Sequence, residues 1–401
     1  MRNLNKIIFL NINRQIGFCY QNRRCHQERS LKLKQKPNFN DERLIDPVRY
    51  LFRNASVIVS NLDNIYANLA LEEWIYRNYD FSKNNEHILL LWHNRPSVVI
   101  GRHQNVWLEI SVDYCRRNGI DIARRNSGGG TVYQDPNNLN VSFLTSRNSY
   151  NRTKNLEYIQ NILLDEFQIE TIVSPRKDLI TAEKSEKISG TASKLNGHNA
   201  YHHCTLLVDV DQVHLSKSLR KYQIKSVHST ATKSVPSPVT NLKNLNRKLS
   251  LQSLTEALAK NFHKFYGGTN FLINQINPNN LRYFGHMIKD IEEMFKSWLW
   301  IYGSSPPFYH DNVVFYQSSQ ILLRTYIEKG CLGKIEIINS NPNLELLETL
   351  STINSKLNGI SFEEAELLDF FDDLLKQNRK PFVEVLRNNI LKSFKLMTSA
   401  H

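Results

Sequence analysis

The sequence predicts an α+β protein whose strands and helices follow no regular alternation. The apolar runs 88–92 and 97–101 have the length of strands and are separated by the turn residues 93–96. Residues 251–266 instead place apolar side chains at helical spacing, which indicates an amphipathic helix. There is neither a strict strand–helix–strand order nor an internal repeat, so we expect a mixed α and β fold.

Other elements are predicted from caps and turn residues. Asp63 or Asn64 can cap a helix through residues 68–75, because either side chain can accept hydrogen bonds from the first free N–H groups. The polar stretch 217–248 contains Pro236 and Pro238 and is interpreted as a loop. Further strands are expected over 121–125, 131–133, 140–143 and 204–209, and a further helix over 158–167.

A second, smaller unit is expected after the Asn/Pro-rich residues 277–280. Two strands, 321–327 and 334–338, are joined by a turn that holds Gly330 and Gly333. Two helices are expected to follow, the last of them opened by a capping box of Ser361 and Glu364. The boundaries are therefore a larger domain over 50–275 and a small α/β C-terminal accessory domain over 280–401, and no catalytic constellation is found in the accessory domain.

Composition narrows the class of protein. The chain has 401 residues and is 41% hydrophobic, enough for a sizeable core. Its apolar runs are far shorter than the ~20 residues of a membrane helix, so we expect a soluble protein with no membrane partner. The five cysteines are far apart and form no Cys-x-x-Cys pair, which disfavours a disulfide framework and a zinc site and fits a reducing compartment.

The net charge of +13 is concentrated at the N-terminus. Residues 1–36 hold nine Lys/Arg and one acid, Glu28, and thus account for +8 of that charge. An Arg-rich, acid-poor start is typical of a mitochondrial transit peptide, which we place over 1–45; a basic disordered tail is the alternative. The remaining +5 suits an acidic protein partner at least as well as nucleic acid, and no aromatic–basic stacking motif supports a nucleic-acid binder.

The most informative segment is the glycine run in RRNSGGGTVY, residues 124–133. Three adjacent glycines cost chain entropy, and they make sense where the backbone takes positive φ or where a ligand approaches the main chain. Successive N–H groups in such a loop can bind an anion, and Arg124 and Arg125 add positive charge. A P-loop and a Rossmann fingerprint are both excluded by the surrounding pattern. A flexible hairpin tip is the alternative.

A second candidate is Lys187 in KISGTASK, residues 187–194. Acyl transfer from a mixed anhydride needs positive charge beside the phosphate and the carbonyl, and one lysine can serve both. An ordinary surface lysine is the competing interpretation. His202 and His203 are adjacent on a predicted strand and point to opposite faces, so they are poorly placed to hold one metal ion. Cys204 has no obvious partner base.

Several motifs, in this order, resemble the lipoate–protein ligase A family. They are SVVIGRHQN (97–105), RRNSGGGTVYQD (124–135), NLNVSF (138–143), KISGTASK (187–194) and YHHCTLL (201–207). The segment SVPSPVTNL (234–242) resembles a loop of that family's mitochondrial lipoyltransferases, and WIYG (300–303) resembles the start of its accessory domain. The likeness covers roughly residues 61–308. Gln134 and Pro307 depart from the family, which often has His and Lys there.

The resemblance implies a biotin/lipoate ligase-type mixed sheet flanked by helices. It also implies that Lys187 contacts the acyl carbonyl and the phosphate of a lipoyl-adenylate. Gly128, Gly129 and Gly130 would shape the lipoyl tunnel, and Arg125 would orient the loop or meet the ligand's charge. Other positions implied to hold the acyl-nucleotide are Tyr133, Arg176, Thr205, Val235 and Ser237. No metal ligand is implied.

The resemblance further implies a mitochondrial matrix enzyme. It would transfer lipoyl from lipoyl-AMP, or from a lipoylated glycine-cleavage H protein, to a lysine of lipoyl domains in 2-oxoacid dehydrogenase E2 subunits. The alternative is a full ligase that activates lipoate itself and needs ATP and Mg. A monomer is expected. The acyl donor and the lipoyl versus octanoyl preference stay open.

Overall fold

A computed structural model describes residues 57–79, 81, 87–220, 224–267, 273–281, 284–338, 342–377 and 380–399. The transit segment expected over 1–45 lies outside these residues. The strands are β1 (Val57–Ser60), β2 (Ile88–Trp92), β3 (Ser97–Ile100), β4 (Asp121–Arg124), β5 (Val132–Gln134), β6 (Asn138–Ser146), β7 (Thr171–Val173), β8 (Leu179–Thr181), β9 (Ser189–Leu195), β10 (Asn199–Leu207), β11 (Val227–Ser229), β12 (Ile273–Ile276), β13 (Phe308–Tyr316), β14 (Ser319–Glu328) and β15 (Cys331–Ile337).

The helices match the predicted segments closely where the apolar period is clear. They are α3 (Ile65–Asn78), α4 (Val106–Glu109), α5 (Val112–Arg117), α6 (Arg152–Phe167), α7 (Gln212–Ser218), α8 (Leu242–Leu245), α9 (Leu251–Tyr266), α10 (Pro278–Leu281), α11 (Gly285–Lys296), the π-helical turn η2 (Leu299–Gly303), α12 (Leu344–Asn354), α13 (Glu364–Gln377) and α14 (Pro381–Thr398). Asn64 caps α3, since its side chain accepts from the N–H groups of Tyr66 and Ala67.

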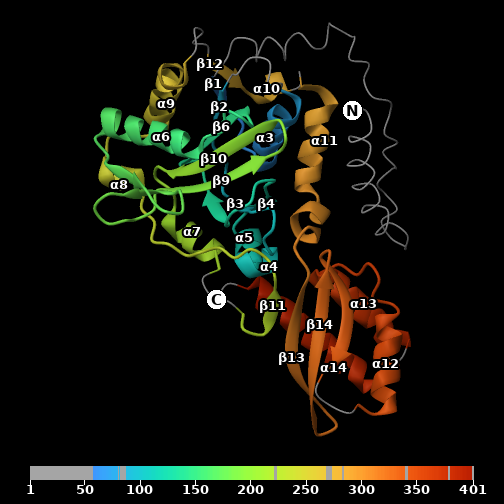
Figure 1. Cartoon of the computed structure of the whole chain (residues 1–401). Helices are drawn as coiled ribbons and strands as arrows, with labels where there is room; N and C mark the ends of the chain where they lie inside the picture. The colour runs from blue at the N-terminus through green and yellow to red at the C-terminus, as the bar shows by residue number, and fades with distance from the viewer. Residues whose placement is uncertain are drawn as a thin grey trace.

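A six-stranded mixed sheet forms the centre of the larger domain, in the order β12-β1-β2-β6-β10-β9. β1 is parallel to both β12 and β2, whereas β6 is antiparallel to β2 and β10. Helices α6 and α9 cover one face and helices α3 and α11 the other (Figure 1). This is the α+β fold that the sequence predicts, a mixed sheet flanked by helices.

The apolar pattern of β2 explains this layering. Ile88, Leu90 and Trp92 pack with α3 and α11, and Leu89 and Leu91 pack with α6 and α9. Because side chains alternate between the two faces of a strand, an uninterrupted apolar run is required wherever both faces are covered. Each such side chain contributes roughly 1.5–3 kcal/mol when fully buried.

A three-stranded sheet in the order β4-β3-β5 carries the glycine loop. β2 and β3 are consecutive in the chain, yet they lie in different sheets and do not form a hairpin. β4 and β5 flank β3 on either side, parallel and antiparallel to it. The segment that joins β4 to β5 must therefore pass over the end of β3, directly beside Gly101.

The accessory part of the chain is larger than the sequence pattern indicates. Its antiparallel sheet has the order β11-β13-β14-β15, and three helices, α12, α13 and α14, follow it rather than two. Gly333 lies within β15 and not in the turn. β11 comes from the stretch interpreted as loop and pairs with β13, so residues 227–229 add a strand to the accessory sheet. A short strand without strong alternation gives no clear local signal.

The two parts share one hydrophobic core. Trp107 of α4 is buried, and its ring lies 5.6 Å from Tyr302, 5.5 Å from Phe308 and 5.6 Å from Phe362, measured between ring centroids. Aromatic rings at these separations add packing energy beyond the area that they bury. The accessory domain is therefore joined to the domain that holds the glycine loop by a continuous apolar contact.

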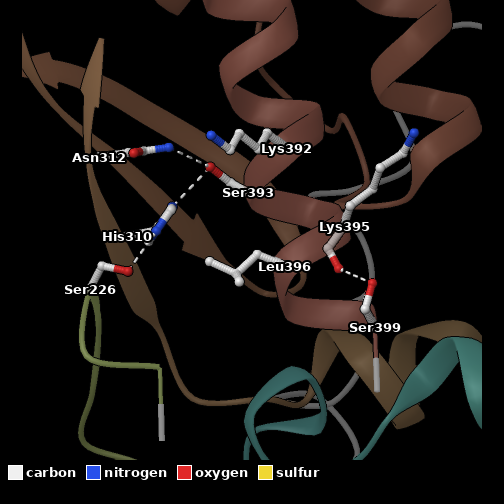
Figure 2. Close-up of a pocket in the computed structure, with 8 residues that line it drawn as sticks. All are labelled: Ser226, His310, Asn312, Lys392, Ser393, Lys395, Leu396 and Ser399. Carbon is white, nitrogen blue, oxygen red and sulfur yellow. Dashed lines mark hydrogen bonds between the residues drawn. The ribbon is translucent and has the colours of Figure 1, made fainter. Parts of the chain in front are cut away.

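A pocket of about 330 Å³ is lined by residues of β13, of α14 and its C-terminal end, and of the segment before β11 (Figure 2). His310 of β13 spans it: one ring nitrogen lies 3.0 Å from the Ser226 hydroxyl and the other 2.9 Å from that of Ser393. Burial holds the pKa of His310 below its ordinary value. The histidine thus links the segment before β11 to helix α14. Among the described residues, no helix has the length and apolar character to cross a membrane.

Candidate active site

The glycine loop lies against Gly101, the residue after β3. A Cβ atom at Gly101 would come within 2.1 Å of the Gly129 carbonyl oxygen, so only glycine fits there. Gly129 itself has φ of 83°, in the left-handed region that disfavours side chains. A Cβ at Gly128 would meet no atom within 4 Å, so this glycine is open on its outer side. The loop therefore presents backbone without a covering side chain at this position.

Arg125 holds the loop from inside. The guanidinium is buried and donates to the carbonyl oxygens of Gly128 and Gly130, both at 2.6 Å, and to that of Val99 at 2.9 Å. Its Nε donates to the Ser127 hydroxyl at 3.0 Å. Burial lowers the pKa of Arg125 to about 10. All of these bonds go to the loop and to β3, so the side chain fixes the shape of the loop from beneath.

A buried polar chain supports the same loop from the other side. The Ser127 hydroxyl lies 2.8 Å from Nε2 of His203, and Nδ1 of His203 lies 2.9 Å from the Glu72 carboxylate. Glu72 also accepts from the Ser142 hydroxyl at 2.6 Å. Fully satisfied buried networks of this kind make a structure rigid. The glycine loop is thereby tied to α3 and to the central strands β6 and β10.

Arg124 connects the loop to the accessory domain. It is fully buried and donates to the carbonyl oxygens of Gln104 and Ile301, both at 2.7 Å, and to the Ser305 hydroxyl at 2.9 Å. Among the described residues no carboxylate pairs with it, and burial lowers the pKa of Arg124 to about 9. Because these acceptors belong to two segments nearly 200 positions apart, Arg124 ties the linker around η2 to the segment after β3.

Lys187 lies just before β9, between two other chain segments. Its backbone pairs with Ile180 on one side and with Val239 on the other. The ammonium nitrogen is 3.0 Å from the Asp178 carboxylate, and 25% of the side chain is exposed. The lysine is therefore neither buried in the core nor extended into open solvent. Its charge lies near the surface, beside the residues that follow the Ser234–Pro238 loop.

Gly190 brings the lysine segment against the glycine loop. A Cβ atom at Gly190 would lie 3.1 Å from a Val132 methyl carbon and 3.4 Å from the Thr205 hydroxyl. Its N–H donates to that hydroxyl at 2.9 Å. On the other side of the loop, a Cβ at Gly129 would lie 3.5 Å from Ala192. The strand that begins at residue 189 thus packs against the glycine loop and the start of β5, through residues three and five positions after Lys187.

The segment 234–238 covers the end of the glycine loop. The Ser234 hydroxyl accepts from the Thr131 N–H and from the Gln104 amide, both at 3.0 Å, and donates to the Glu109 carboxylate. Burial raises the pKa of Glu109. Val235 is 59% exposed and Ser237 is exposed as well, so the next residues of the segment face outward from this anchor.

Two further residues implied to hold the acyl-nucleotide lie outside the glycine loop. Arg176 is exposed in the turn between β7 and β8, and its carbonyl oxygen accepts from Arg152. Arg152 also donates to the Thr191 hydroxyl on β9, which places a second arginine beside the strand after Lys187. Tyr133 points into the core, where its ring stacks on His214 at 6.4 Å. Only the backbone of Tyr133 therefore lies toward the glycine loop.

Gln134, one of the departures from the family pattern, and the histidine pair have structural explanations. Gln134 is buried and bonds Asn94 at 2.7 Å and Asn140 at 2.8 Å. His202 faces Asn155 and His203 faces Glu72, on opposite sides of the strand as expected. Among the described residues, no group of three or more potential ligands is placed to hold a metal ion.

Cys204 is buried, and burial raises the pKa of its thiol to about 12, which disfavours the thiolate. Its sulfur lies 3.8 Å from the Val141 carbonyl oxygen. A nucleophilic role for this cysteine is therefore not supported.

Five contributors to the site were not identified from the sequence: Gln104, Glu109, Arg152, Asp178 and Ser234. Four of them act on partners far away in the chain, and Asp178 lies nine positions before Lys187 in a stretch with no distinctive pattern. A carboxylate shortly before a candidate lysine was the one local signal available for Asp178. Gln104 and Ser234 lie within the family-like segments 97–105 and 234–242, but no local pattern indicates their roles, and none marks Glu109 or Arg152.

Comparison with known proteins identifies the relatives of this arrangement. Residues 64–263 match the family described as "Lipoyl protein ligase A/B catalytic domain". The chain is 37% identical over 332 residues to human "Lipoyl amidotransferase LIPT1, mitochondrial", covering 81% of this chain and 86% of that protein. It is 32% identical over 315 residues to the Schizosaccharomyces pombe "Putative lipoate-protein ligase A", covering 75% and 84% of the two chains.

Solved structures share the fold. The structure described as "P. falciparum LipL1 in complex lipoate" superposes with a TM-score of 0.56 at 28% identity, covering 84% of this chain and 99% of that one. A "lipoate-protein ligase A bound with ATP" gives a TM-score of 0.51 at 23% identity, covering 63% and 99%. At that identity the second likeness supports the fold alone.

Proposed function

Because this chain belongs to the lipoate–protein ligase A family, we propose that it transfers a lipoyl group to a lysine of lipoyl domains in 2-oxoacid dehydrogenase E2 subunits. It is an acyltransferase. The observation that carries the proposal is the position of Lys187. Its partly exposed ammonium pairs with Asp178. Its backbone lies next to the end of segment 234–238 and directly before β9, the strand that packs against the glycine loop. Sequence identity to a lipoyl amidotransferase supports transfer as the main activity.

Different groups of the site are proposed to bind the donor and to stabilise the transition state. The glycine loop, held by Arg125, offers backbone to the acyl end, and Gly128 is its open position. Lys187 places a positive charge where negative charge builds on the carbonyl oxygen and on the leaving phosphate. The acceptor lysine attacks as a neutral amine, and its nitrogen bonds to the acyl carbon while the bond to the AMP oxygen breaks. AMP leaves with that electron pair, and the nitrogen loses its surplus proton to solvent. The activated donor leaves the protein chiefly a positioning and electrostatic role.

Segment 235–237 and Arg176 are proposed to hold the nucleotide part of lipoyl-AMP. Val235 and Ser237 are exposed beside the Ser234 anchor. Arg176 is exposed in the β7–β8 turn, close to Arg152, which adds positive charge on that side. Thr205 is proposed to act through Gly190, because its hydroxyl accepts a hydrogen bond from the Gly190 N–H. Tyr133 is proposed to contribute backbone contacts only.

The alternative function is a full ligase that also makes the adenylate from ATP and lipoate. Resemblance to lipoate–protein ligases favours it. It would require ATP and Mg, and Mg²⁺ bound with a nucleotide needs only one or two protein carboxylates. The site here offers Asp178, whose carboxylate is already paired with Lys187.

The proposed setting follows from the same relatives. Lipoate or its adenylate is the substrate, with a lipoylated glycine-cleavage H protein as a second possible donor. The human and mouse relatives are both named mitochondrial, and we place this chain in the mitochondrial matrix. We propose a monomer that meets its acidic acceptor domain through the modest positive charge left outside the first 36 residues.

One experiment separates these possibilities. An apo lipoyl domain is incubated with the protein and lipoyl-AMP, with lipoylated H protein, or with ATP, Mg and free lipoate, and the added mass is read by mass spectrometry. Transfer from lipoyl-AMP is the expected result. Pyrophosphate release with ATP and lipoate would establish the ligase alternative. No acylation from any of the donors would overturn the proposed function.

A further inference from the structure

Ser234 is the meeting point of three chain segments. Its hydroxyl accepts two hydrogen bonds, from the Thr131 N–H and the Gln104 amide, and donates one to Glu109. A hydroxyl has one donor and two acceptor sites, so its capacity is fully used. The Ser234 N–H also donates to the Glu109 carboxylate, at 3.2 Å.

Glu109 and Gln104 are both buried, and both are hydrogen-bonded to Ser234. The Glu109 carboxylate accepts hydrogen bonds from the Ser234 N–H and hydroxyl and, at 3.5 Å, from the Thr131 hydroxyl. Gln104 is fully buried and accepts from the Gly101 N–H at 2.9 Å and from the Thr131 hydroxyl at 2.8 Å. Burying polar groups is unfavourable unless their partners are in place, so separating segment 234–238 would leave these groups unsatisfied.

The contact lies at the end of the glycine run. A Cβ atom at Gly130 would come within 3.1 Å of the Ser234 hydroxyl, so the two segments touch. On its other side the segment continues to Val239, which pairs with Lys187. Residues 235–238 are therefore held between an anchor on the glycine loop and an anchor on the catalytic lysine.

We propose that Glu109 and Gln104 are positioning residues that clasp Ser234 and thereby hold segment 235–238 over the adenylate end of the acyl donor. The inference deepens the proposed function and rests on it. None of the three side chains needs to touch the reacting carbonyl. Their role is to keep the exposed residues Val235 to Ser237 ordered before the donor arrives, so that its nucleotide part meets a preformed surface.

The test compares four variants in the transfer assay with preformed lipoyl-AMP. Ser234→Ala removes the hydroxyl at which the three segments meet, and Glu109→Gln removes the negative charge of the carboxylate that accepts its hydrogen bond. Ser234→Thr keeps the hydroxyl and serves as the rescue. Glu170→Gln is the matched control, because Glu170 is exposed and lies outside the site. A non-reactive lipoyl-sulfamoyl-adenosine gives Kd directly by calorimetry.

If the clasp acts on the bound donor, Ser234→Ala and Glu109→Gln should each raise KM for lipoyl-AMP about tenfold. Their kcat should stay within about twofold of the wild-type value. Kd for the analogue should rise in parallel, and Ser234→Thr should restore KM to within about threefold. A merely structural role would instead lower kcat through loss of active protein and leave KM and Kd unchanged.

The outcomes distinguish failure of the clasp from failure of the proposed function. If the wild-type protein transfers lipoyl and Ser234→Ala binds the analogue as tightly as wild type, the clasp is wrong and the function stands. If the wild-type protein does not transfer lipoyl from any donor, the proposed function itself fails. Should Glu109→Gln not fold, Ser234→Ala still decides, since Ser234 lies on a surface segment.

Discussion

The Lys187 ammonium and the Asp178 carboxylate lie 3.0 Å apart, although neither side chain is fully buried. Asp178 ends the turn before β8, and Lys187 pairs across from β8 at Ile180. The short β7–β8 hairpin therefore brings the carboxylate to the lysine. An ion pair with partial exposure adds at most about 1 kcal/mol to stability, so we assign it the task of orienting the lysine.

Replacing Lys187 should abolish transfer without unfolding the protein. We expect Lys187→Met to lower the transfer rate at least about 100-fold, because a charge that stabilises the transition state is lost. Its Tm should stay within about 3 °C of wild type, since the lost pair is partly exposed. Lys184→Met, at an exposed neighbour, is the control. Mass spectrometry of the acceptor domain and thermal melting check both points, and retained transfer by Lys187→Met would refute the assignment.

Gly129 and Gly128 should respond differently to the same substitution. Gly129→Ala puts a Cβ 3.1 Å from Arg125 and requires positive φ, so it should destabilise the fold by roughly 1–3 kcal/mol. Gly128→Ala meets no atom and should leave urea unfolding unchanged, but it should lower transfer activity if the donor approaches this open backbone. Equal unfolding midpoints for the two variants would contradict the account of the loop.

Arg125→Lys should weaken the fold despite keeping the charge. Lysine cannot reach Val99, Gly128 and Gly130 together, because its three donors sit on one nitrogen. We expect a loss of about 2–4 kcal/mol in the free energy of unfolding. Arg147→Lys, which changes an exposed arginine, should shift it by less than about 0.5 kcal/mol. Chemical denaturation monitored by tryptophan fluorescence measures both, and an unchanged Arg125→Lys midpoint would count against the buried fork.

Stability should fall as pH drops from about 6.5 to 5. Burial lowers the pKa of His202 well below its ordinary value and that of His87 to about 4. Their folded pKa values lie below the unfolded value of about 6.5, so the unfolded chain takes up protons first and acid favours unfolding. Each group contributes a slope of up to about 1.4 kcal/mol per pH unit.

His202→Gln should flatten this dependence, because the buried ring is removed. His198→Gln, at an exposed position, should keep the wild-type slope. Urea unfolding at several pH values between 7 and 5 provides the comparison. Identical slopes for wild type and His202→Gln would show that His202 is not the group responsible.

Local patterns in the sequence identified much of the fold. The strand 88–92 and the helix 251–266 appear at those bounds, because an apolar run covered on two faces and a 3.6-residue period are both visible in the chain itself. The accessory helices were undercounted and β13 was not identified, since its buried and exposed side chains do not alternate cleanly. β11 joins a sheet made almost entirely from residues 80 positions later, which no local pattern indicates.

The sequence by itself determined the elements, the glycine run and the candidate lysine, because each is encoded by neighbouring residues. Only the tertiary structure decided that Arg125 turns inward to the loop carbonyls, that Tyr133 points into the core, and that Glu109 meets Ser234 across 125 positions. Such pairings arise when distant segments pack together. Their energies depend on burial and mutual satisfaction of hydrogen bonds, which exist only once the chain has folded.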